Sequence, residues 1–351
     1  MPSEGLKGRG AASNPPNRFE SIAYERDEDA DPSEEIAPKT LLYKDASRTI
    51  LTSNDSPDVP FTWSLNPYRG CEHGCAYCYA RPTHEYLGFS AGLDFESRIM
   101  VKENAPLLLR EELSSPRWRP DVVVMSGVTD CYQPVERKLR LTRRCLEVFA
   151  EFRNPVGVIT KNALVARDAD VFAELAKYDA GAACVSITTL DPEVARKLEP
   201  RASAPYKRLQ AIEVLAKAGA FVSVNAAPVI PGINDHELPA ILKAAADAGA
   251  KAAGFTVVRL PYAVAPLFEE WLSLHFPDRK EKVLSQLRAM RGGKLYEPRF
   301  GERMRGRGNF AEQIAALFEL GRKKAGLNRN RFALSTASFK RRGGPQLELF
   351  S

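Results

Sequence analysis

The chain has 351 residues, of which 44% are hydrophobic, and a formal net charge of +6. This length allows one large domain with extensions or two modest domains. The sequence contains no apolar run of about eighteen residues, the length a membrane span requires. Its polar, Gly- and Pro-rich start lacks the apolar core of a secretory signal. We therefore expect a cytoplasmic protein with no membrane contact.

Residues 1–40 are expected to form a disordered, partly acidic extension. They pass from a Gly-, Asn- and Pro-rich start into an acidic stretch at 20–35 with few large apolar side chains. The next segment, 41–60, contains two short apolar runs, Leu41–Tyr43 and Thr49–Thr52, separated by turn-forming residues. This pattern predicts a short hairpin that leads into the main domain.

Strand-like and helical patterns alternate between residues 61 and 262. The predicted strands are Phe61–Leu65, Asp121–Ser126, Val156–Thr160, Ala183–Thr188, Phe221–Pro228 and Ala252–Leu260. Helical patterns occupy 104–113, 136–152, 167–177, 192–198, 205–218 and 235–248, with Asp191 and Asp235 as candidate N-caps. Strands that are each followed by a helix form parallel β/α units. Six such units predict an α/β fold, a partial (β/α)6 TIM-like barrel rather than a closed eight-unit barrel.

The remainder is expected to be a helical extension, 263–327, with an amphipathic helix at 309–325, followed by a basic tail, 328–351. Residues 288–342 hold fifteen Lys or Arg and four Asp or Glu, with phenylalanines interleaved. The basic residues include Arg291, Lys294, Arg299, Arg303, Arg305, Arg307, Arg322–Lys324, Arg329, Arg331 and Lys340–Arg342. Such a region attracts phosphate, so DNA or RNA is an expected partner. A solvated tail with no defined partner is the alternative.

Three of the six cysteines, Cys71, Cys75 and Cys78, fall within eight residues, directly after the first predicted strand of the main domain. A disulfide framework is a poor explanation in a cytoplasmic chain of this size, and the cluster indicates a metal. Three thiolates in one loop can bind three irons of a 4Fe–4S cluster and leave the fourth iron open to a small molecule. Clusters that only carry electrons usually have four cysteine ligands.

A zinc site is the alternative reading of this motif. His73 or His84 would supply the fourth ligand. The second cysteine pair that is typical of zinc modules does not occur in the sequence. We therefore favour the iron–sulfur cluster and expect His73 to lie beside it in the loop rather than to bind the metal.

The C-x3-C-x2-C spacing, with Tyr77 before the last cysteine, resembles the signature of the radical S-adenosylmethionine (radical SAM) superfamily. Motifs at four later strand ends, Ser126–Asp130, Val158–Lys161, Ser186–Thr189 and Ala227–Asp235, are similar to those of its spore photoproduct lyase-related branch. The resemblance covers roughly residues 60–260. It implies a 4Fe–4S cluster on the three cysteines, S-adenosylmethionine on the open iron, an electron donor that reduces the cluster, and a 5′-deoxyadenosyl radical that attacks a C–H bond.

The resemblance also implies cofactor contacts, position by position. These are Tyr77 and the backbone of Val229–Gly232 along the adenine, Thr129 and Asp130 at the amino and carboxylate end, Lys161 on the carboxylate, and Ser186 and Thr188 at the ribose. Singly, Thr129–Asp130 could be a helix cap and Ser186 an ordinary strand residue. As a series at successive strand ends they favour a binding site.

One departure from the branch concerns Gly127, which stands where spore photoproduct lyase has the cysteine that returns a hydrogen atom to thymine. This departure argues against thymine-dimer repair. Cys131, four residues later, is a candidate catalytic hydrogen donor or thiyl site, with a packed cysteine as the alternative. The adjoining residues Tyr132–Pro134 and Glu136 could meet substrate.

The last residues, Gln346–Phe350, read Gln-Leu-Glu-Leu-Phe and follow a Gly-Gly-Pro segment. They are similar to the peptide with which bacterial polymerases and repair proteins dock on the DNA sliding clamp. The alternative is that Leu347, Leu349 and Phe350 fold back onto the protein's own surface.

These patterns predict a radical SAM enzyme whose substrate is nucleic acid or is associated with nucleic acid. One alternative keeps the cofactor but has a protein or small-molecule substrate. The other is a non-catalytic iron–sulfur or zinc protein that binds nucleic acid. The strand-end motifs with Asp130 and Lys161 favour an enzyme, because a binding module would not need them.

Overall fold

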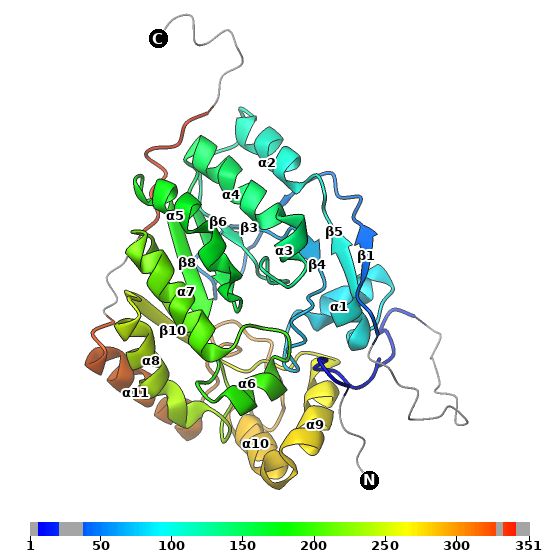
Figure 1. The fold of residues 1–351 in the computed structure, drawn as a ribbon. Helices are drawn as coiled ribbons and strands as arrows, with labels where there is room; N and C mark the ends of the chain where they lie inside the picture. The colour runs from blue at the N-terminus through cyan, green and yellow to red at the C-terminus, as the bar shows by residue number, and fades with distance from the viewer. Residues whose placement is uncertain (1–5, 21–37, 328–332, 342–351) are drawn as a thin grey trace, which may run out of the picture.

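The computed structural model of the protein describes residues 6–20, 38–327 and 333–341. Two sheets organise this part of the chain (Figure 1): a seven-stranded sheet in the order β10-β9-β8-β7-β6-β3-β2 and a three-stranded sheet in the order β1-β5-β4. The acidic stretch after residue 20 and the Gln346–Phe350 peptide lie outside the described residues.

Six strands of the large sheet are parallel, and they match the six predicted strands. The sheet consists of β2 (Leu51–Ser53), β3 (Trp63–Leu65), β6 (Val123–Met125), β7 (Val156–Thr160), β8 (Gly181–Ser186), β9 (Phe221–Val229) and β10 (Ala252–Val257). Because β10 and the antiparallel β2 are its two edges, the barrel is open. The predicted α/β fold with a partial barrel is confirmed.

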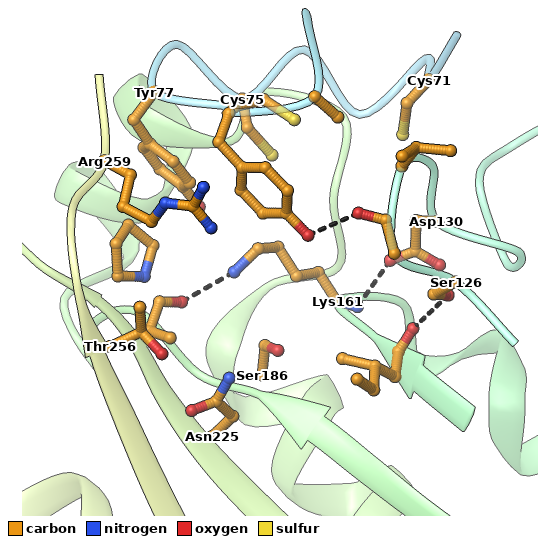
Figure 2. A pocket seen from close by; sticks show the side chains of 18 of the residues that line it. Cys71, Cys75, Tyr77, Ser126, Asp130, Lys161, Ser186, Asn225, Thr256 and Arg259 are labelled. Atoms are coloured by element: carbon orange, nitrogen blue, oxygen red, sulfur yellow. Dashed lines mark hydrogen bonds between the residues drawn. The ribbon is translucent and has the colours of Figure 1, made fainter. Parts of the chain in front are cut away.

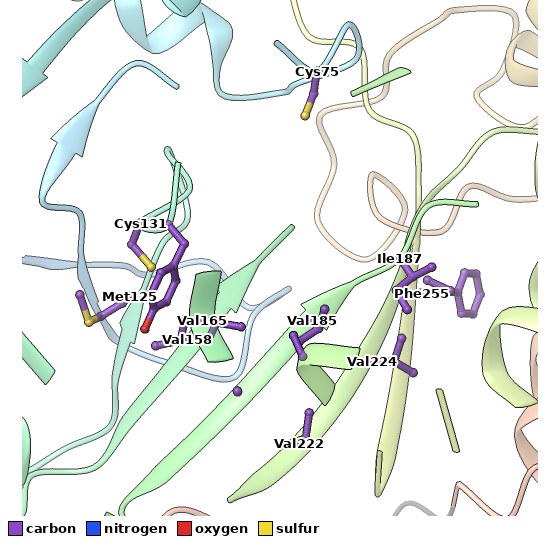
Figure 3. Packing of buried hydrophobic residues seen from close by; sticks show 14 of the residues in the cluster. Cys75, Met125, Cys131, Val158, Val165, Val185, Ile187, Val222, Val224 and Phe255 are labelled. Carbon is purple, nitrogen blue, oxygen red and sulfur yellow. The ribbon is translucent and has the colours of Figure 1, made fainter. Parts of the chain in front are cut away.

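Helices cover the outer face of this sheet (Figure 1). The main ones are α2 (Ala105–Ser114), α4 (Leu141–Phe152), α5 (Ala169–Ala176), α7 (Pro205–Lys217) and α8 (Leu238–Asp247). Short helical segments connect them: η2 (Arg81–Leu87), α1 (Leu93–Ser97), α3 (Glu136–Leu139), η3 (Ala163–Asp168), α6 (Pro192–Leu198) and η4 (Asp235–Glu237). Strand side chains such as Val158, Val185 and Val224 belong to the apolar core that joins the layers (Figure 3).

Of the two predicted helix caps, one is confirmed and one is wrong. Asp191 Oδ1 accepts hydrogen bonds from the backbone N–H of Glu193 at 2.7 Å and Val194 at 3.3 Å, and so caps α6. Asp235 lies in η4 and accepts from the N–H of Gly232 at 2.9 Å instead. Its carboxylate therefore closes the preceding turn, and α8 begins three residues later.

The predicted hairpin at 41–60 is wrong, since its two strands have different partners. β1 (Leu41–Lys44) pairs in parallel with β5 (Arg98–Val101), and β4 (Tyr68–Arg69) pairs with the other edge of β5. β2 pairs antiparallel with β3. An isolated two-stranded hairpin is only marginally stable. Here each strand extends a sheet whose other strands come from later in the chain.

The expected disorder of the N-terminal extension is wrong for residues 6–20. The backbone N–H groups of Gly10 and Ala11 donate to the Glu96 carboxylate at 3.1 and 2.9 Å. The Asn17 side chain donates to the carbonyl oxygen of Glu85 at 2.9 Å. Residues 6–20 contain few large apolar side chains, so their composition did not indicate that hydrogen bonds attach them to the main domain.

The predicted helical extension is present as α9 (Val264–His275), α10 (Pro277–Ala289) and α11 (Asn309–Lys324). A non-helical loop, residues 290–308, connects α10 to α11. In this loop Met304 accepts a backbone hydrogen bond from Val257 on edge strand β10 at 2.9 Å. Gly301 N–H donates to Asp58 at 2.7 Å, and Arg303 forms an ion pair with the same carboxylate. Since Asp58 lies between β2 and β3, the loop bridges the open side of the barrel.

The basic residues after 288 do not form one surface. Arg291 is only 1% exposed and donates to the carbonyl oxygen of Val258. Farther along, Ser335 N–H donates to Asp179 O, and the Arg341 guanidinium donates to Trp118 O, at 2.9 and 2.8 Å. Asp179 and Trp118 precede β8 and β6, so the segment 333–341 crosses the end of the barrel where strands begin. No helix among the described residues is long and apolar enough to cross a membrane.

Candidate active site

A cavity of about 290 Å³ lies at the carboxyl ends of the parallel strands (Figure 2). Its lining includes Cys71, Cys75 and Cys78 from the loop after β4, together with residues that end β6 to β10. Met304 from the bridging loop also lines it. The carboxyl end of a parallel barrel is where such folds place their chemistry, so this cavity is the candidate active site.

The cysteine loop is held in place by a buried ion pair. The Arg81 guanidinium, which is fully buried, donates to the Cys75 carbonyl oxygen at 2.8 and 3.0 Å and to the Glu96 carboxylate at 2.5 Å. Glu96 in turn accepts the Gly10 and Ala11 N–H groups. A buried carboxylate and guanidinium need such additional partners to offset desolvation. The loop shape therefore depends on both η2 and the N-terminal segment.

Gly10 is packed so closely on the cysteine loop that no side chain fits there. A Cβ at Gly10 would lie 1.6 Å from the carbonyl oxygen of Gly74, between the first two cysteines. Gly74 itself has a φ of +67°, and a Cβ there would lie 2.8 Å from the Glu96 carboxylate. Two glycines thus allow two backbone segments to meet directly behind the thiols.

The donor set fits an iron–sulfur cluster better than a single ion. Among the residues that the structure describes, no three His, Cys, Asp or Glu side chains are grouped as ligands of one metal ion. A zinc site needs four ligands around a single ion. In a 4Fe–4S cluster each thiolate binds a different iron, so three separate thiols that line one cavity suit it.

Neither histidine is placed as a fourth zinc ligand. His84 is buried outside the cavity lining, with Nε2 2.9 Å from the carbonyl oxygen of Arg98. His73 Nδ1 lies 3.4 Å from Asp130 Oδ2, and its Nε2 lies 3.2 Å from Asn162 Nδ2. Burial lowers the pKa of His73, but the Asp130 carboxylate and Cys71 outweigh burial and raise this pKa to about 10. These contacts place His73 beside the cysteines, as the sequence predicted.

Asp130 and Thr129 line the cavity, but their polar atoms already have protein partners. The Asp130 carboxylate accepts from Thr160 Oγ1 at 2.7 Å and from the Lys161 N–H at 2.7 Å, and so connects the ends of β6 and β7. Burial raises its pKa, but His73 and these hydrogen bonds lower it below the ordinary value overall. Thr129 Oγ1 donates to Gly70 O at 2.7 Å. Both residues position the loop; their contact with the cofactor stays a prediction.

Lys161 lies at the centre of a buried polar network. Its ammonium donates to the Ala227 carbonyl oxygen at 2.8 Å and to Thr188 Oγ1 at 3.2 Å, and lies 3.2 Å from Glu199 Oε1. Glu199 is 3% exposed and also accepts from Tyr77, Thr188 and Arg208. Burial raises the pKa of Glu199, but Arg208 and Lys161 lower it well below the usual range. Two cations thus face one carboxylate, which leaves positive charge at Lys161 for an anionic ligand.

The structure brings together some of the predicted cofactor residues but not all. Those that line the cavity are Tyr77, Thr129, Asp130, Lys161 and Ser186. Thr188 lies behind Lys161 in the Glu199 network, and Val229 is buried in the sheet. At Gly232 a Cβ would lie 3.2 Å from Gln286 on α10, so this turn faces the helix. Ala227 and Pro228 line the cavity where Val229 and Gly232 were expected.

Cys131, the predicted catalytic residue, lies in the apolar core with Met125 and Val158 (Figure 3). It is fully buried and does not belong to the cavity lining. Its Sγ lies 3.5 Å from Ser126 Oγ, and burial raises the pKa of the thiol well above its ordinary value. This position does not support the hydrogen-donor role, and the packed cysteine is the better description.

Of the neighbours of Cys131 that were expected to meet substrate, Tyr132, Gln133 and Glu136 are buried too, and Pro134 is half-buried. Tyr132 OH donates to Asp168 at 2.9 Å, and Gln133 Nε2 donates to Gly70 O at 3.2 Å. Glu136 accepts from Arg167 at 2.9 Å. Each of these side chains supports the fold around the cysteine loop.

Sequence reasoning missed several residues of the site: Tyr79, Glu199, Arg208, Asn225, Thr256, Arg259 and Met304. Asn225 and Thr256 interrupt apolar strands, a signal that could have been noticed. Arg259 follows β10, and its guanidinium carbon lies 4.8 Å from the centre of the Tyr79 ring. Nothing local distinguishes Glu199, because its partners come from four different segments.

A family model described as the radical SAM superfamily matches residues 65–245. The chain belongs to the radical SAM superfamily. An uncharacterized protein of Mycobacterium tuberculosis is 35% identical over 252 residues, which are 71% of this chain and 73% of the relative. A protein of Pseudomonas phage M6 named radical SAM Nalpha-GlyT isomerase is 26% identical over 247 residues, 70% of this chain and 49% of the phage protein.

Among solved structures, the chain is similar to spore photoproduct lyase complexed with a dinucleoside spore photoproduct. The TM-score is 0.58 with 16% sequence identity, and the match covers 81% of this chain and 79% of the other. At this identity the likeness shows a shared fold. Superfamily membership implies a 4Fe–4S cluster and S-adenosylmethionine, in agreement with the three thiols on the cavity wall.

Proposed function

We propose that this enzyme uses S-adenosylmethionine to start radical chemistry on nucleic acid. The observation that carries the proposal is one cavity lined both by the three cysteines of the motif and by Lys161, whose charge is incompletely neutralised. When bound, the reduced cluster supplies the electron that splits S-adenosylmethionine into methionine and a 5′-deoxyadenosyl radical, which takes a hydrogen atom from a substrate C–H bond. The electron comes from an external one-electron reductant.

The side chains of this protein would bind and orient the reactants. Cys71, Cys75 and Cys78 would each hold one iron. The Lys161 ammonium would interact with Glu199 and with the carboxylate of the cofactor at the same time, because a compact point charge can attract two anions. The Tyr77 ring, 5.6 Å from the Lys161 nitrogen, would line the cofactor beside Ala227. Since all of these groups are buried or half-buried, they act with little competition from water.

The nucleic acid part of the proposal is supported by the structural neighbour and by an exposed aromatic ring. The structural neighbour was solved with a dinucleoside ligand. Phe300 of the bridging loop is 55% exposed and lies against Arg303, whose guanidinium is paired with Asp58. An exposed aromatic ring suits stacking with the bases of a single strand. A protein or small-molecule substrate is the competing possibility, with no observation that favours it.

The test is anaerobic reconstitution followed by detection of 5′-deoxyadenosine. Reduced protein should form it slowly with S-adenosylmethionine alone and faster, or with a modified product, when DNA or RNA oligonucleotides are added. A reconstituted protein that forms 5′-deoxyadenosine but responds to no oligonucleotide would contradict the substrate class. One that forms none under any condition would contradict the whole proposal.

We also propose that Gln346–Phe350 docks the enzyme on the DNA sliding clamp. Leu347, Leu349 and Phe350 would fill an apolar pocket, and Gln346 would anchor the backbone through its amide. A short peptide loses conformational entropy when it becomes ordered on binding, so we expect an affinity of about micromolar. Fluorescence anisotropy of a labelled 345–351 peptide against purified clamp tests this. Binding should weaken for Gln346→Ala and Phe350→Ala, and no binding at high micromolar clamp would contradict it.

A further inference from the structure

Lys161 and Arg259, which both enter the cavity, differ in their partners. In Figure 2, Lys161 and Arg259 extend into the cavity from different strands. Lys161 has a carboxylate, a carbonyl and a hydroxyl within 3.2 Å. Among the described residues Arg259 has one side-chain hydrogen bond, 3.6 Å from a guanidinium nitrogen to the Met304 sulfur, besides its stacking on the Tyr79 ring. Its Nε is shielded from solvent and has no hydrogen-bond partner.

This lack of oxygen partners sets Arg259 apart from the fully buried arginines. Arg81 and Arg208 each bind a carboxylate and carbonyl oxygens, and Arg291 binds two carbonyl oxygens. The buried Nε–H of Arg259 has no acceptor, and a buried donor without an acceptor is costly. The natural acceptor for a planar guanidinium is a bidentate anion such as a carboxylate or a phosphate.

Arg259 is also held in a fixed position before any ligand binds. Its guanidinium lies over the Tyr79 ring, and the Tyr79 hydroxyl donates to the carbonyl oxygen of Gly127. The neighbouring residue is fixed as well, since the Val258 N–H donates to Val229 O at 2.9 Å. Stacking that orients a guanidinium reduces the entropy lost when it binds an anion.

Two uncommitted polar side chains lie on the strands of the same wall. Asn225 on β9 and Thr256 on β10 line the cavity, and neither side chain has a hydrogen bond within the described part of the chain.

We infer that Arg259, next to Thr256 at the end of β10, forms a substrate subsite in which its guanidinium binds a phosphodiester of the substrate. This inference rests on the proposed nucleic acid function and assigns its substrate recognition to the wall formed by β9 and β10. The cofactor occupies the wall of Lys161. Arg259 is thus a substrate-binding residue that neither the cysteine motif nor the strand-end motifs contain.

The test measures binding of a fluorescein-labelled ten-nucleotide single-stranded DNA to cluster-loaded protein by anisotropy, over a series of salt concentrations. Arg259→Gln should weaken binding at least tenfold and reduce the salt slope by about 0.7, the value for one phosphate contact on a single strand. Arg259→Lys keeps the positive charge but cannot donate two parallel hydrogen bonds to one phosphate, so its affinity for the oligonucleotide should lie between those of wild type and Arg259→Gln. Arg110→Gln is the matched control, because Arg110 pairs with Glu151 on the outer helices; its affinity should stay within twofold.

A second measurement separates substrate binding from cofactor binding. Anaerobic titration compares the affinity of wild type and Arg259→Gln for S-adenosylmethionine, and the two affinities should agree if Arg259 contacts only the substrate. If the variant loses affinity for S-adenosylmethionine, Arg259 serves the cofactor and the inference is wrong. If the variant binds DNA like wild type, the subsite is wrong while the nucleic acid function stands. If wild-type protein binds no oligonucleotide, the proposed substrate class fails and the phosphodiester assignment fails with it.

Discussion

The two walls of the cavity differ in how far their polar groups are already satisfied. On the wall formed by the cysteine loop and the ends of β6 and β7, Asp130, Lys161 and Glu199 bind one another or nearby backbone. On the wall formed by β9 and β10, Asn225, Thr256 and Arg259 lack such partners among the described residues. The difference agrees with our proposals, in which the first wall is preorganised for one constant ligand, the cofactor, and Arg259 on the second wall binds a substrate.

The largest effect should come from the thiols that define the first wall. Cys75→Ala should abolish cluster assembly, because it removes the ligand of one iron and three ligands are the minimum here. Iron and sulfide analysis after anaerobic reconstitution measures this. Cys145→Ala, a buried cysteine on α4, is the control and should keep about four irons per chain. Stoichiometric zinc in place of iron in the wild type would refute the cluster.

Lys161→Ala should weaken binding of S-adenosylmethionine roughly ten- to hundredfold and leave the iron content unchanged. The lost charge-assisted hydrogen bond is typically worth about 1.5–3 kcal/mol, and each 1.4 kcal/mol is about tenfold in affinity. Anaerobic calorimetric titration with the cofactor measures it. Lys243→Ala is a suitable control, because Lys243 pairs with Asp247 on the exposed side of α8. Unchanged affinity in Lys161→Ala would mean that Glu199 keeps the ammonium and that another group binds the carboxylate.

The parts of the structure that could be predicted from the sequence are those encoded by residues close together in the chain. Residue spacing was sufficient to find the cysteine motif, and periodicity was sufficient to find the six parallel strands. The pairing of β1 with β5, the attachment of Gly10 and Ala11 to Glu96, and the Glu199 network all join residues far apart. No local pattern carries such contacts. The sequence shows that Cys131 follows Asp130, but it does not show that the thiol lies outside the cavity lining.

Gly10→Ala should destabilise the protein by about 1–3 kcal/mol, the range for overpacking a close contact. The methyl group would meet the Gly74 carbonyl oxygen, so the cysteine loop must move. Thermal unfolding of the cluster-free protein measures the destabilisation, and the iron retained after gel filtration measures the effect on the cluster.

Gly157→Ala on β7 is the matched control for Gly10→Ala. Its new Cβ would make an ordinary 3.6 Å contact with Val124. It should retain iron like the wild type, whereas Gly10→Ala should lose it faster. Equal retention by both variants would show that the N-terminal segment only lies against the loop and does not support it.

The smallest effect should come from Cys131, which the sequence had suggested for chemistry. Cys131→Ala should form 5′-deoxyadenosine at the wild-type rate and should give the same products, because the thiol is fully buried and outside the cavity lining. The loss of packing should cost about 1 kcal/mol in the free energy of unfolding, similar to the loss of a buried methylene. Cys145→Ala, an equally buried cysteine, should cost a similar amount. If Cys131→Ala forms the radical normally but its products stall or divert, the thiol reaches the substrate during turnover. The segment after β6 that carries Cys131 would then have to move into the cavity during turnover, in addition to the two walls described above.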